Sequence, residues 1–529
     1  MAEVAQETSR PNAARRERRR TRTAGAAARA AATEDAGAPN PANLNLSNPF
    51  PPIRVFSEDQ IEAIHETSMT MLEEIGLNIL LDEAREIFRA AGADVNDETQ
   101  RVRFDRNLIL EAVGKAPSSV TLYSRNPHRD ITFGGNRVVF ATVGGPPNVS
   151  CLEHGRRPGT LAAFEDLLRL AQSFDVLHVI TPMVEPIDIA PGLRHLEMTR
   201  SMALLTDKIP FLYSRGREAV ADSLEMMRIS RGASWEEFQK RPGCYTVINA
   251  NSPLQLDIPM CKGIIDFAKT GQLMILTPFT LAGAMAPVTI AGALAQQNAE
   301  ALTGIALSQL VNPGAPVTYG GFTSNVDMKS GAPAFGTPEY VHAAFASGQL
   351  ARRYNLPWRS SNTNASNTPD AQAAYESQMS LWGALMGGCN FLLHGAGWLE
   401  GGLTASMEKF IIDVEMLQMF ARVFQPPPCD SAALGLDAIR EVGPGGHYFG
   451  CAHTLERYEN AFYAPMLSDW RNFETWQEGG SVNATDRAHK IYKDTIAAFE
   501  PPPLDPAIRD ELDAFVAKRT EEGGANLES

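Results

Sequence analysis

Strand-like and helix-like segments alternate eight times between residues 138 and 425. Each unit begins with a short apolar run, as in a buried strand, and continues into a longer segment with helical periodicity. The apolar runs are 138–143, 176–182, 209–214, 244–251, 273–279, 316–321, 356–361 and 390–395. Strands that alternate with helices pair in parallel, and uninterrupted apolar strands indicate a sheet covered on both faces. The pattern predicts an α/β fold, a (β/α)8 TIM barrel, with a doubly wound open sheet as the alternative.

The segments around these units predict three further parts. Residues 1–48 are rich in Arg and Ala with almost no large apolar residue, which predicts a disordered basic tail; an arm for an acidic partner is the alternative. Residues 49–137 predict an N-terminal cap of three helices followed by strands. Residues 138–425 would be the barrel domain. Residues 426–529, dense in aromatics, predict a C-terminal extension that packs over the barrel or forms a homo-oligomer contact.

Charge and apolar run length exclude several functional classes. The formal net charge is −15, which argues against nucleic acid as a partner. No apolar run reaches the roughly 18 residues of a membrane span, and the N-terminus lacks the apolar region of a secretory signal. The six cysteines are scattered without a CxxC pair, which is typical of free thiols in a reducing compartment. The sequence therefore predicts a cytoplasmic protein with no membrane partner.

Side chains at the carboxyl ends of the strands are the candidate site, because that end of a parallel barrel carries the reactive groups. No strand ends in Lys, and no Asp, Glu and His cluster has metal-ligand spacing, so neither a Schiff base nor a metal site is predicted. What remains is mostly uncharged and aromatic. The candidate substrate-binding residues are Tyr213, Asn249, Asn251, Phe279, Tyr319, Phe322, Arg359, His394 and Trp398.

Aromatic rings with one or two cations suit a ligand that carries a permanent positive charge and a carboxylate. Ring faces attract a quaternary ammonium group through their quadrupoles. Arg359 or His394 could then hold a carboxylate at the other end of the ligand. The alternative is structural: aromatic residues beside barrel strands usually pack, and an Arg after a strand often pairs with a helix carboxylate.

The loop after the sixth strand, residues 319–338, is long and rich in small residues. It contains the polar residues Asn325, Asp327 and Lys329 and ends at a proline. Such a loop at the mouth of a barrel predicts a lid, with an ordinary surface loop as the alternative.

Three long segments resemble the trimethylamine methyltransferase family. They are "YGGFTSNVDMKSGAPAFGTPEY" from Tyr319, "SSNTNASNTPDAQAAYES" from Ser360 and "GPGGHYFGCAHTLERY" from Gly443, and the resemblance covers residues 50 to about 500. It implies a (β/α)8 barrel enzyme that passes a methyl group from a methylated amine to the Co(I) of a separate corrinoid protein. The corrinoid would come with that partner rather than bind tightly here, and no zinc site is implied.

One departure from the family bears on the substrate. The trimethylamine-specific members carry pyrrolysine, which would fall between Arg359 and Asp370, and this sequence has only standard residues there. The resemblance therefore implies a quaternary amine such as glycine betaine, proline betaine or carnitine. It also implies that His394 and either Asn249 or Asn251 approach the substrate carboxylate, with His394 positioning the substrate.

Two other functions stay open from the sequence. One is a lyase or hydrolase that uses His394 as a base with Glu400 or Asp327. The other is a non-catalytic module that binds betaine.

Overall fold

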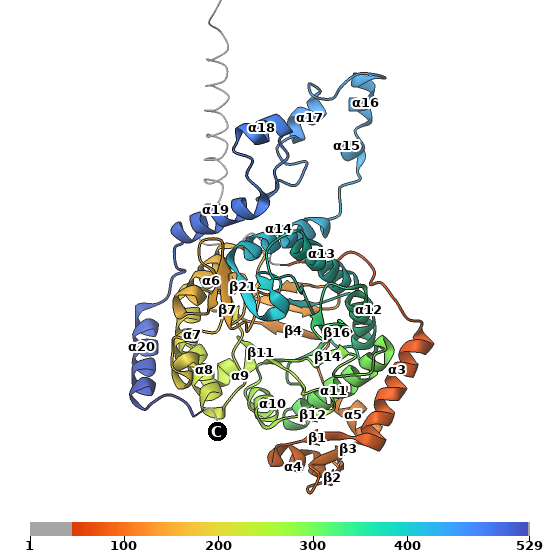
Figure 1. The fold of residues 1–529 in the computed structure, drawn as a ribbon, viewed down its shortest axis with the longest axis vertical. Helices are drawn as coiled ribbons and strands as arrows, with labels where there is room; N and C mark the ends of the chain where they lie inside the picture. Colours follow the sequence, from red (N-terminus) through yellow and green to blue (C-terminus); the bar gives the residue numbers. More distant parts are fainter. Residues whose placement is uncertain (1–44, 527–529) are drawn as a thin grey trace, which may run out of the picture. The chain divides into compact units, whose positions relative to one another are not determined.

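The computed structural model describes residues 45–526; residues 1–44 and 527–529 lie outside the described part. The chain divides after Asn40 into two units, and every described residue belongs to the second. Most of the basic tail that we expected over residues 1–48 therefore lies outside the described residues. The described part has a mixed α/β fold with a curled parallel sheet at its centre (Figure 1).

Six parallel strands form the main sheet, in the spatial order β11-β13-β15-β18-β19-β6. A second parallel pair, β9-β10, is joined to it by two isolated parallel bridges, Ala141 to Val179 and Phe211 to Tyr245. The strands are β6 (Val139–Phe140), β9 (Val179–Ile180), β10 (Ile209–Pro210), β11 (Tyr245–Ile248), β13 (Leu273–Leu276), β15 (Val317–Gly320), β18 (Trp358–Ser361) and β19 (Phe391–Leu393). Each of the eight apolar runs in the sequence contains one of these strands.

A helix follows each of the eight strands along the chain. Side-chain oxygens cap several of these helices at their first turn, among them those of Thr160, Asp257 and Asp370. The helices are α6 (Leu161–Ser173), α7 (Pro191–Leu205), α8 (Arg217–Ser230), α10 (Ile258–Thr270), α11 (Ile290–Val311), α12 (Pro338–Arg353), α13 (Ala371–Met386) and α14 (Met407–Val423); a short α9 (Trp235–Lys240) follows α8.

The parallel strands bury one apolar cluster on their inner face. It contains residues of six of the eight strands, taken alternately along a strand because successive side chains point to opposite faces. The cluster includes Val139, Val179, Ile209, Phe211, Tyr245, Leu273, Ile275, Phe391 and Leu393. The hairpin of β4 (Ser119–Leu122) and β5 (Ile131–Gly134) adds Val120, Leu122, Ile131 and Phe133 to it. The other strand face packs on the helices in a larger cluster.

Trp358 shows which face of β18 points outward. Its ring lies against Gly348 of α12 and Gly387 at the end of α13, where an added Cβ would come within 3.1 Å and 3.0 Å of the ring. Only glycine leaves room for the indole at these two positions. Because Trp358 points toward the helices, the next residue, Arg359, points to the inner face, opposite Phe391 of β19.

The N-terminal cap contains the three expected helices and a small sheet that the sequence did not indicate. The helices are α3 (Glu58–Thr70), which continues into the π-helix η1 (Met71–Ile75), α4 (Asp82–Ala90) and α5 (Arg106–Val113). The sheet has the order β12-β1-β3-β2, from β1 (Leu77–Ile79), β2 (Asp94–Asn96), β3 (Arg101–Arg103) and β12 (Gln255–Leu256). Strand β12 comes from the loop after β11, so this sheet ties the cap to the main fold.

Two more small sheets lie in the loops after the parallel strands. One has the order β14-β16-β17, from β14 (Phe279–Ala282), β16 (Phe322–Val326) and β17 (Pro333–Ala334). The other has the order β20-β21-β7-β8, from β7 (Asn148–Cys151), β8 (Gly155–Pro158), β20 (Trp398–Leu399) and β21 (Thr404–Ser406), with the 3-10 turns η2 (Pro127–Arg129) and η3 (Glu400–Gly402) elsewhere in the loops. The segments that follow the strands are thus ordered by pairing with one another.

The C-terminal part consists of helices. They are α15 (Ser431–Leu434), α16 (Leu436–Val442), α17 (Ala452–Arg457), α18 (Phe473–Glu478), α19 (Ala484–Ala497) and α20 (Pro506–Glu521). Helix α19 packs against α14, and α20 packs against α7 and α8. A search of the described residues found no helix long and apolar enough to cross a membrane.

Candidate active site

Five rings meet where the strands β14, β16 and β19 and their loops come together. Phe322 is at the centre: its ring centroid lies 5.0 Å from that of Phe279, 5.8 Å from Phe335, 6.2 Å from His394 and 6.2 Å from Trp398. His394 and Trp398 are 4.3 Å apart. The structure therefore brings together four of the residues that the sequence selected. Phe335 was missed, and its signal was an aromatic residue within an otherwise small-residue loop.

Arg359 is a buried cation beside this ring cluster. Its guanidinium carbon lies 5.1 Å from the centroid of Phe322, and the residue is 2% exposed. Nε and Nη1 have no hydrogen-bond partner, and no ion pair links Arg359 to a carboxylate of the described residues. Burial lowers its pKa to about 10, so the guanidinium still carries its charge near neutral pH. An unpaired buried cation of this kind requires an anion to compensate its lost hydration.

His394 has an unusual backbone and a defined proton position. Its φ is 57°, a left-handed conformation that costs a non-glycine residue about 1–2 kcal/mol. The backbone N–H of Gly144 donates to Nδ1 of the ring at 3.2 Å, so the neutral ring carries its proton on Nε2. Burial, and then the charge of Arg359, lower the pKa of His394 well below its usual value. The ring is neutral and offers an Nε2–H donor.

Asn249 and Tyr213 lie at the open end of the inner face. Along β11 that face changes from the fully buried Tyr245 through the half-buried Val247 to the exposed Asn249. The inner face is therefore accessible to solvent at the carboxyl ends of the strands. Tyr213 follows β10, and burial together with the nearby Glu185 carboxylate raises the pKa of its hydroxyl well above the usual value.

Two candidate residues have other positions. Tyr319 lies on the outer face of β15, where its hydroxyl donates to Oδ1 of Asn298 at 3.1 Å and accepts from Gln297. Alternation in β15 places Thr318, not Tyr319, on the inner face, opposite Ile275. Asn251 donates to the Asp257 carboxylate at 3.0 Å and accepts from the Asp257 N–H, so it fixes the turn before α10. These contacts give both side chains a structural role, and their binding to substrate stays a prediction.

The segment that we expected to be a lid is a β-hairpin. Asn325 is in β16, where its Oδ1 accepts from Thr337 at 3.0 Å, and Asp327 accepts from the N–H groups of Lys329 and Ser330 in the turn. Lys329 itself is exposed. The hairpin delivers Phe335 to the ring cluster, so its polar turn residues are ordered by local bonds while an apolar side chain reaches the site.

A buried ion pair holds the loops that carry the site. Lys409 and Asp413, one turn apart on α14, are fully buried and bonded to each other. Asp413 also accepts from the N–H of Gly397 at 2.9 Å and from Asn362 at 3.2 Å, so it ties the loop after β19 to the loop after β18. Asn364 and Trp398 add reciprocal bonds of 2.7 Å and 3.0 Å. Trp398 is thereby oriented before any ligand arrives.

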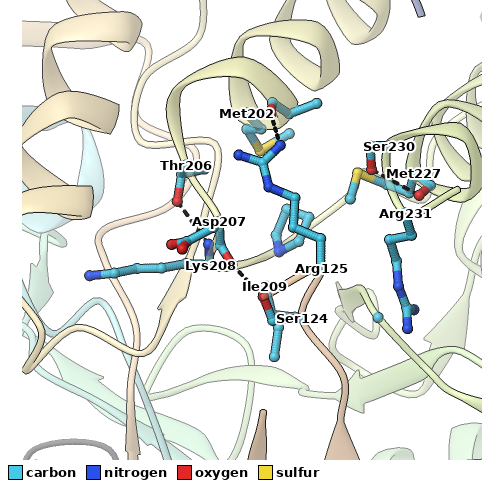
Figure 2. A pocket seen from close by; sticks show the side chains of 13 residues that line it. Ser124, Arg125, Met202, Thr206, Asp207, Lys208, Ile209, Met227, Ser230 and Arg231 are labelled. Atoms are coloured by element: carbon cyan, nitrogen blue, oxygen red, sulfur yellow. Dashed lines mark hydrogen bonds between the residues drawn. The ribbon is translucent and has the colours of Figure 1, made fainter. Parts of the chain in front are cut away.

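A small cavity lies at the opposite, amino end of the strands (Figure 2). It has a volume of about 20 Å³, the room of one water molecule, and Arg125, Asp207 and Lys208 are among the residues that line it. Lys208 donates to the carbonyl of Phe174 at 2.7 Å, and burial lowers its pKa well below the usual value. Asp207 and Lys208 directly precede β10, so this cavity lies at the amino end of the sheet, away from the candidate site.

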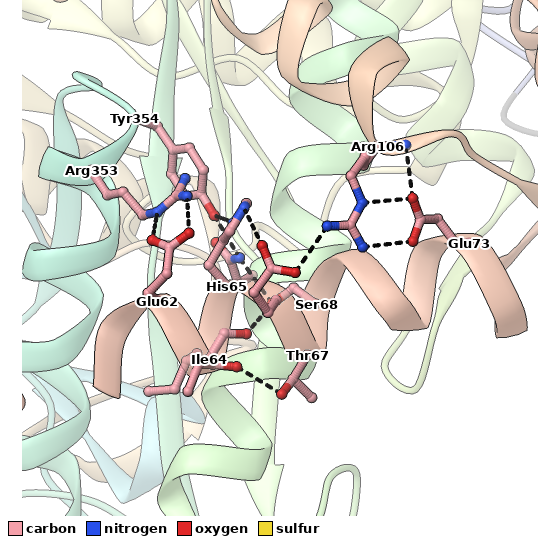
Figure 3. A network of polar contacts seen from close by, with 12 residues as sticks. Glu62, Ile64, His65, Thr67, Ser68, Glu73, Arg106, Arg353 and Tyr354 are labelled. Carbon is pink, nitrogen blue, oxygen red and sulfur yellow. Dashed lines mark hydrogen bonds and ion pairs between the residues drawn. The ribbon is translucent and has the colours of Figure 1, made fainter. Parts of the chain in front are cut away.

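One group of three possible metal ligands occurs among the described residues, Glu62, His65 and Glu66 of α3 (Figure 3). Arg353 forms two bonds with Glu62, of 2.8 Å and 2.7 Å, and Arg106 donates to Glu66 at 2.9 Å. His65 is bonded to the Tyr354 hydroxyl at 2.7 Å. These groups are already paired, and their bonds anchor α3 to α12 and α5.

A model of the trimethylamine methyltransferase (MTTB) family matches residues 15–524. Glycine betaine methyltransferase from Desulfitobacterium hafniense (strain Y51) is 38% identical over 477 residues, which cover 90% of this chain and 99% of that protein. Trimethylamine methyltransferase MttB from Desulfitobacterium hafniense (strain DSM 10664 / DCB-2) is 30% identical over 471 residues, which cover 89% of this chain and 94% of that protein.

Among solved structures, the crystal structure of the hydroxylamine MtmB complex is 13% identical, with a TM-score of 0.48 over 87% of this chain and 94% of that chain. The family match spans nearly the whole chain and agrees with the two relatives, each aligned over most of its length. The chain belongs to the trimethylamine methyltransferase family.

Proposed function

We propose that the protein transfers a methyl group from a quaternary amine with a carboxylate, such as glycine betaine or proline betaine, to the Co(I) of a corrinoid protein. The observation that carries this proposal is Arg359, a buried cation without an anionic partner beside a cluster of rings. A zwitterion with a permanent cation and a carboxylate would satisfy both features. The similarity to glycine betaine methyltransferase over 90% of the chain supports the same substrate class.

The rings would hold the trimethylammonium end. Phe279, Phe322 and Trp398 come from three different loops, and Phe335 stacks on Phe322 with an interplanar angle of 16°. A cation over such ring faces gains roughly 0.5–2 kcal/mol per ring when water is excluded. Phe279 is half-buried and Asn249 is exposed, so the substrate would enter the site from this solvent-facing side.

The carboxylate would bind between Arg359 and His394. Two nitrogens of the guanidinium, Nε and Nη1, have no hydrogen-bond partner, and the neutral imidazole offers its Nε2–H. Charge-assisted hydrogen bonds of this kind each contribute about 1.5–3 kcal/mol. Asn249, on the same face, could supply a further donor. The held carboxylate would fix the direction in which the ammonium methyl groups point.

Positioning is then the main task of the protein. As the carbon–nitrogen bond breaks, its electron pair stays on nitrogen and the methyl carbon bonds to cobalt, so the amine product is neutral and needs no proton. The corrinoid is a co-substrate carried by another protein. Water is excluded from the ring cluster, so a concentrated positive charge is solvated less well there than in water. The cluster therefore favours a transition state in which the positive charge is spread over more atoms. The remaining rate acceleration comes from orienting one methyl group in line with the acceptor.

The geometry disfavours acid–base catalysis by His394. Its Nδ1 already accepts a hydrogen bond, and its Nε2 carries a proton, so neither nitrogen is free to remove one. Glu400 is paired with Arg156 at 2.8 Å, and Asp327 is bonded within its own turn. The lyase or hydrolase alternative therefore lacks an available base.

We also propose that the eight parallel strands close into a (β/α)8 barrel. The two bridges that flank β9-β10 support this closure, because they connect β6 to β9 and β10 to β11. The backbone bonds His178 N–H to Phe140 C=O and Leu212 N–H to Tyr245 C=O, of 2.9 Å and 2.8 Å, lie at these junctions. An experimental structure with water between β10 and β11 would contradict closure.

The expected parts at 1–48, 49–137, 138–425 and 426–529 remain predictions, as does a cytoplasmic location. The described cysteines are all free, and five of the six are buried, which is compatible with a reducing compartment.

A panel of methyl donors tests the proposed function. Purified protein is mixed with Co(I) cobalamin or with a corrinoid protein, and methyl–cobalt formation is followed by absorbance. Glycine betaine should react, whereas tetramethylammonium, which has the same cation but no carboxylate, should react at least tenfold more slowly. Equal rates for the two donors would contradict the carboxylate anchor. Binding of betaine without any methyl–cobalt product would favour the non-catalytic module.

A further inference from the structure

The segment from residue 431 to residue 473, which we call the arm, exposes an unusual number of large apolar side chains. It includes α15, α16 and α17 and ends where α18 begins. Ten of its apolar residues are 44–85% exposed: Leu434, Leu436, Ile439, Tyr448, Phe449, Leu455, Tyr458, Phe462, Trp470 and Phe473. None of the helices α15 to α18 packs extensively on another described helix or strand, and Figure 1 shows them beyond α14 and α19.

The exposed apolar area is larger than a free surface normally carries. An aromatic side chain covers about 150–250 Å², so the six exposed aromatic residues of the arm, on average roughly two thirds exposed, leave about 600–1,000 Å² uncovered. The largest apolar patch of a typical monomer is about 300–600 Å², and a stable interface buries about 800 Å² per partner. The arm alone therefore offers the area that a stable interface needs.

A second apolar surface lies on α13 and α14, the helices before the arm. Tyr375, Met379 and Trp382 of α13 are 59%, 40% and 44% exposed, and their spacing of four and three residues puts them in one stripe. Met419 and Val423 of α14 extend it, with 44% and 42% exposure. We call these five residues the α13–α14 face.

We propose that both surfaces are covered by a second copy of this chain, the arm of each copy packing on the α13–α14 face of the other. Reciprocal exchange in a dimer is the smallest closed assembly that covers all four surfaces. Residues 426–428 are three prolines, which favour an extended, semi-rigid linker between α14 and the arm.

Other occupants fit less well. Residues 1–44 have only Met1, Val4 and Leu44 as large apolar side chains, so they cannot match the aromatic surface of the arm. A corrinoid protein must leave after each methyl transfer and would expose the patch between encounters. The arginines of the arm, Arg440, Arg457 and Arg471, are each paired with an acidic neighbour in the arm, so no free cation of this segment steers a transient partner.

The first test is the mass of the full chain in solution, by light scattering or sedimentation at low micromolar concentration. The expected mass is twice the 57.5 kDa chain or a higher whole multiple. The triple variant Phe449→Ser, Phe462→Ser, Trp470→Ser should sediment as a monomer with an unchanged circular dichroism spectrum, because these side chains are 74–85% exposed in the folded chain. Trp235→Ser, a 42% exposed tryptophan outside both surfaces, is the matched control and should keep the mass of the wild type.

The second test identifies the surface that the arm contacts. A photo-crosslinking amino acid replaces Phe449 in unlabelled protein, which is mixed and equilibrated with 15N-labelled protein. Crosslinked peptides should join the unlabelled arm to labelled residues 371–423. Crosslinks only within one chain, a monomeric wild type, or an unchanged mass of the triple variant would each overturn the proposal. These readouts do not depend on methyl transfer, so they stand apart from the proposed activity.

Discussion

At the scale of single residues, Arg359 and His394 are the positions where folding and ligand binding impose different requirements. Arg359 is a buried charge that no described carboxylate compensates, and His394 is held in a left-handed backbone conformation. Both features cost stability. Costs of this kind concentrate at sites where a ligand supplies the missing interaction.

Replacing Arg359 should therefore separate stability from substrate use. Arg359→Met removes the desolvation cost of an unpaired cation, and we expect the free energy of unfolding to rise by about 1–3 kcal/mol. The same variant should raise the KM for glycine betaine by about 10- to 100-fold, because the carboxylate loses its charged partner. Chemical denaturation and methyl–cobalt kinetics measure the two effects. A variant that is destabilised, with an unchanged KM, would assign Arg359 to the core.

His394 gives a pH dependence of stability with a definite sign. Its pKa in the folded protein is lowered, so the unfolded state binds more protons as pH falls below about 6.5. Its contribution to stability is fully present above that pH and is lost as pH decreases, by up to about 1.4 kcal/mol per pH unit.

His394→Asn is the matched variant, because asparagine tolerates the left-handed conformation. Between pH 7 and pH 5 the wild type should lose more stability than the variant, measured by urea denaturation at each pH. The variant should also use betaine less well while it remains folded. Parallel pH profiles for the two proteins would show that His394 titrates normally.

At the scale of elements, the loops after the strands are ordered by pairing and by one buried ion pair. Strand β21 pairs with β7, and β14 pairs with β16, so segments distant in sequence form small sheets where the candidate site lies. The Lys409–Asp413 pair on α14 connects two of these loops through Asn362 and Gly397. The ring cluster is therefore held partly by β7, β21 and α14, which contain none of its rings.

Breaking that pair should be costly, whereas removing both charges should not be. Asp413→Ala leaves the Lys409 ammonium buried and unpaired, and we expect a loss of about 3–5 kcal/mol. The double variant Lys409→Met, Asp413→Leu should recover most of that stability, yet its loops lose the bond to Gly397 and its KM should remain high. Urea denaturation of the single and double variants checks this. Equal stability losses would mean that the hydrogen bonds of Asp413, rather than its charge, dominate.

At the scale of the whole molecule, the basic N-terminal segment and the C-terminal arm differ in what they can contribute. Residues 1–44 lie outside the described part and hold almost no large apolar side chain, whereas the arm exposes ten. Deletion of residues 1–44 should leave the melting temperature and the methyl-transfer rate within error of the full chain. Thermal denaturation and turnover measure this, and a folded but inactive deletion would implicate the segment in docking the corrinoid protein.

The sequence alone determined the order of strands and helices and the residue types at the strand ends. Apolar runs such as 273–279 and 390–395 predict buried strands because burial on both faces is a local property of the run. The same pattern selected Phe322, Arg359, His394 and Trp398 as neighbours, since parallel strands end at one edge. The resemblance to the family came from contiguous segments, which need no knowledge of the fold.

Only the tertiary structure decided which face each side chain takes and which polar groups are paired. Thr318 and Tyr319 are consecutive residues of β15, so their side chains point to opposite faces, Thr318 inward and Tyr319 outward. The side chain of Asn298, distant in sequence, accepts a hydrogen bond from the Tyr319 hydroxyl on the outer face. The position of Phe335 depends on the β16–β17 hairpin, and this hairpin is held in place because β16 also pairs with β14. The unpaired state of Arg359 depends on all of its neighbours at once, and these come from strands and loops far apart in the chain, so no local pattern in the sequence could encode it.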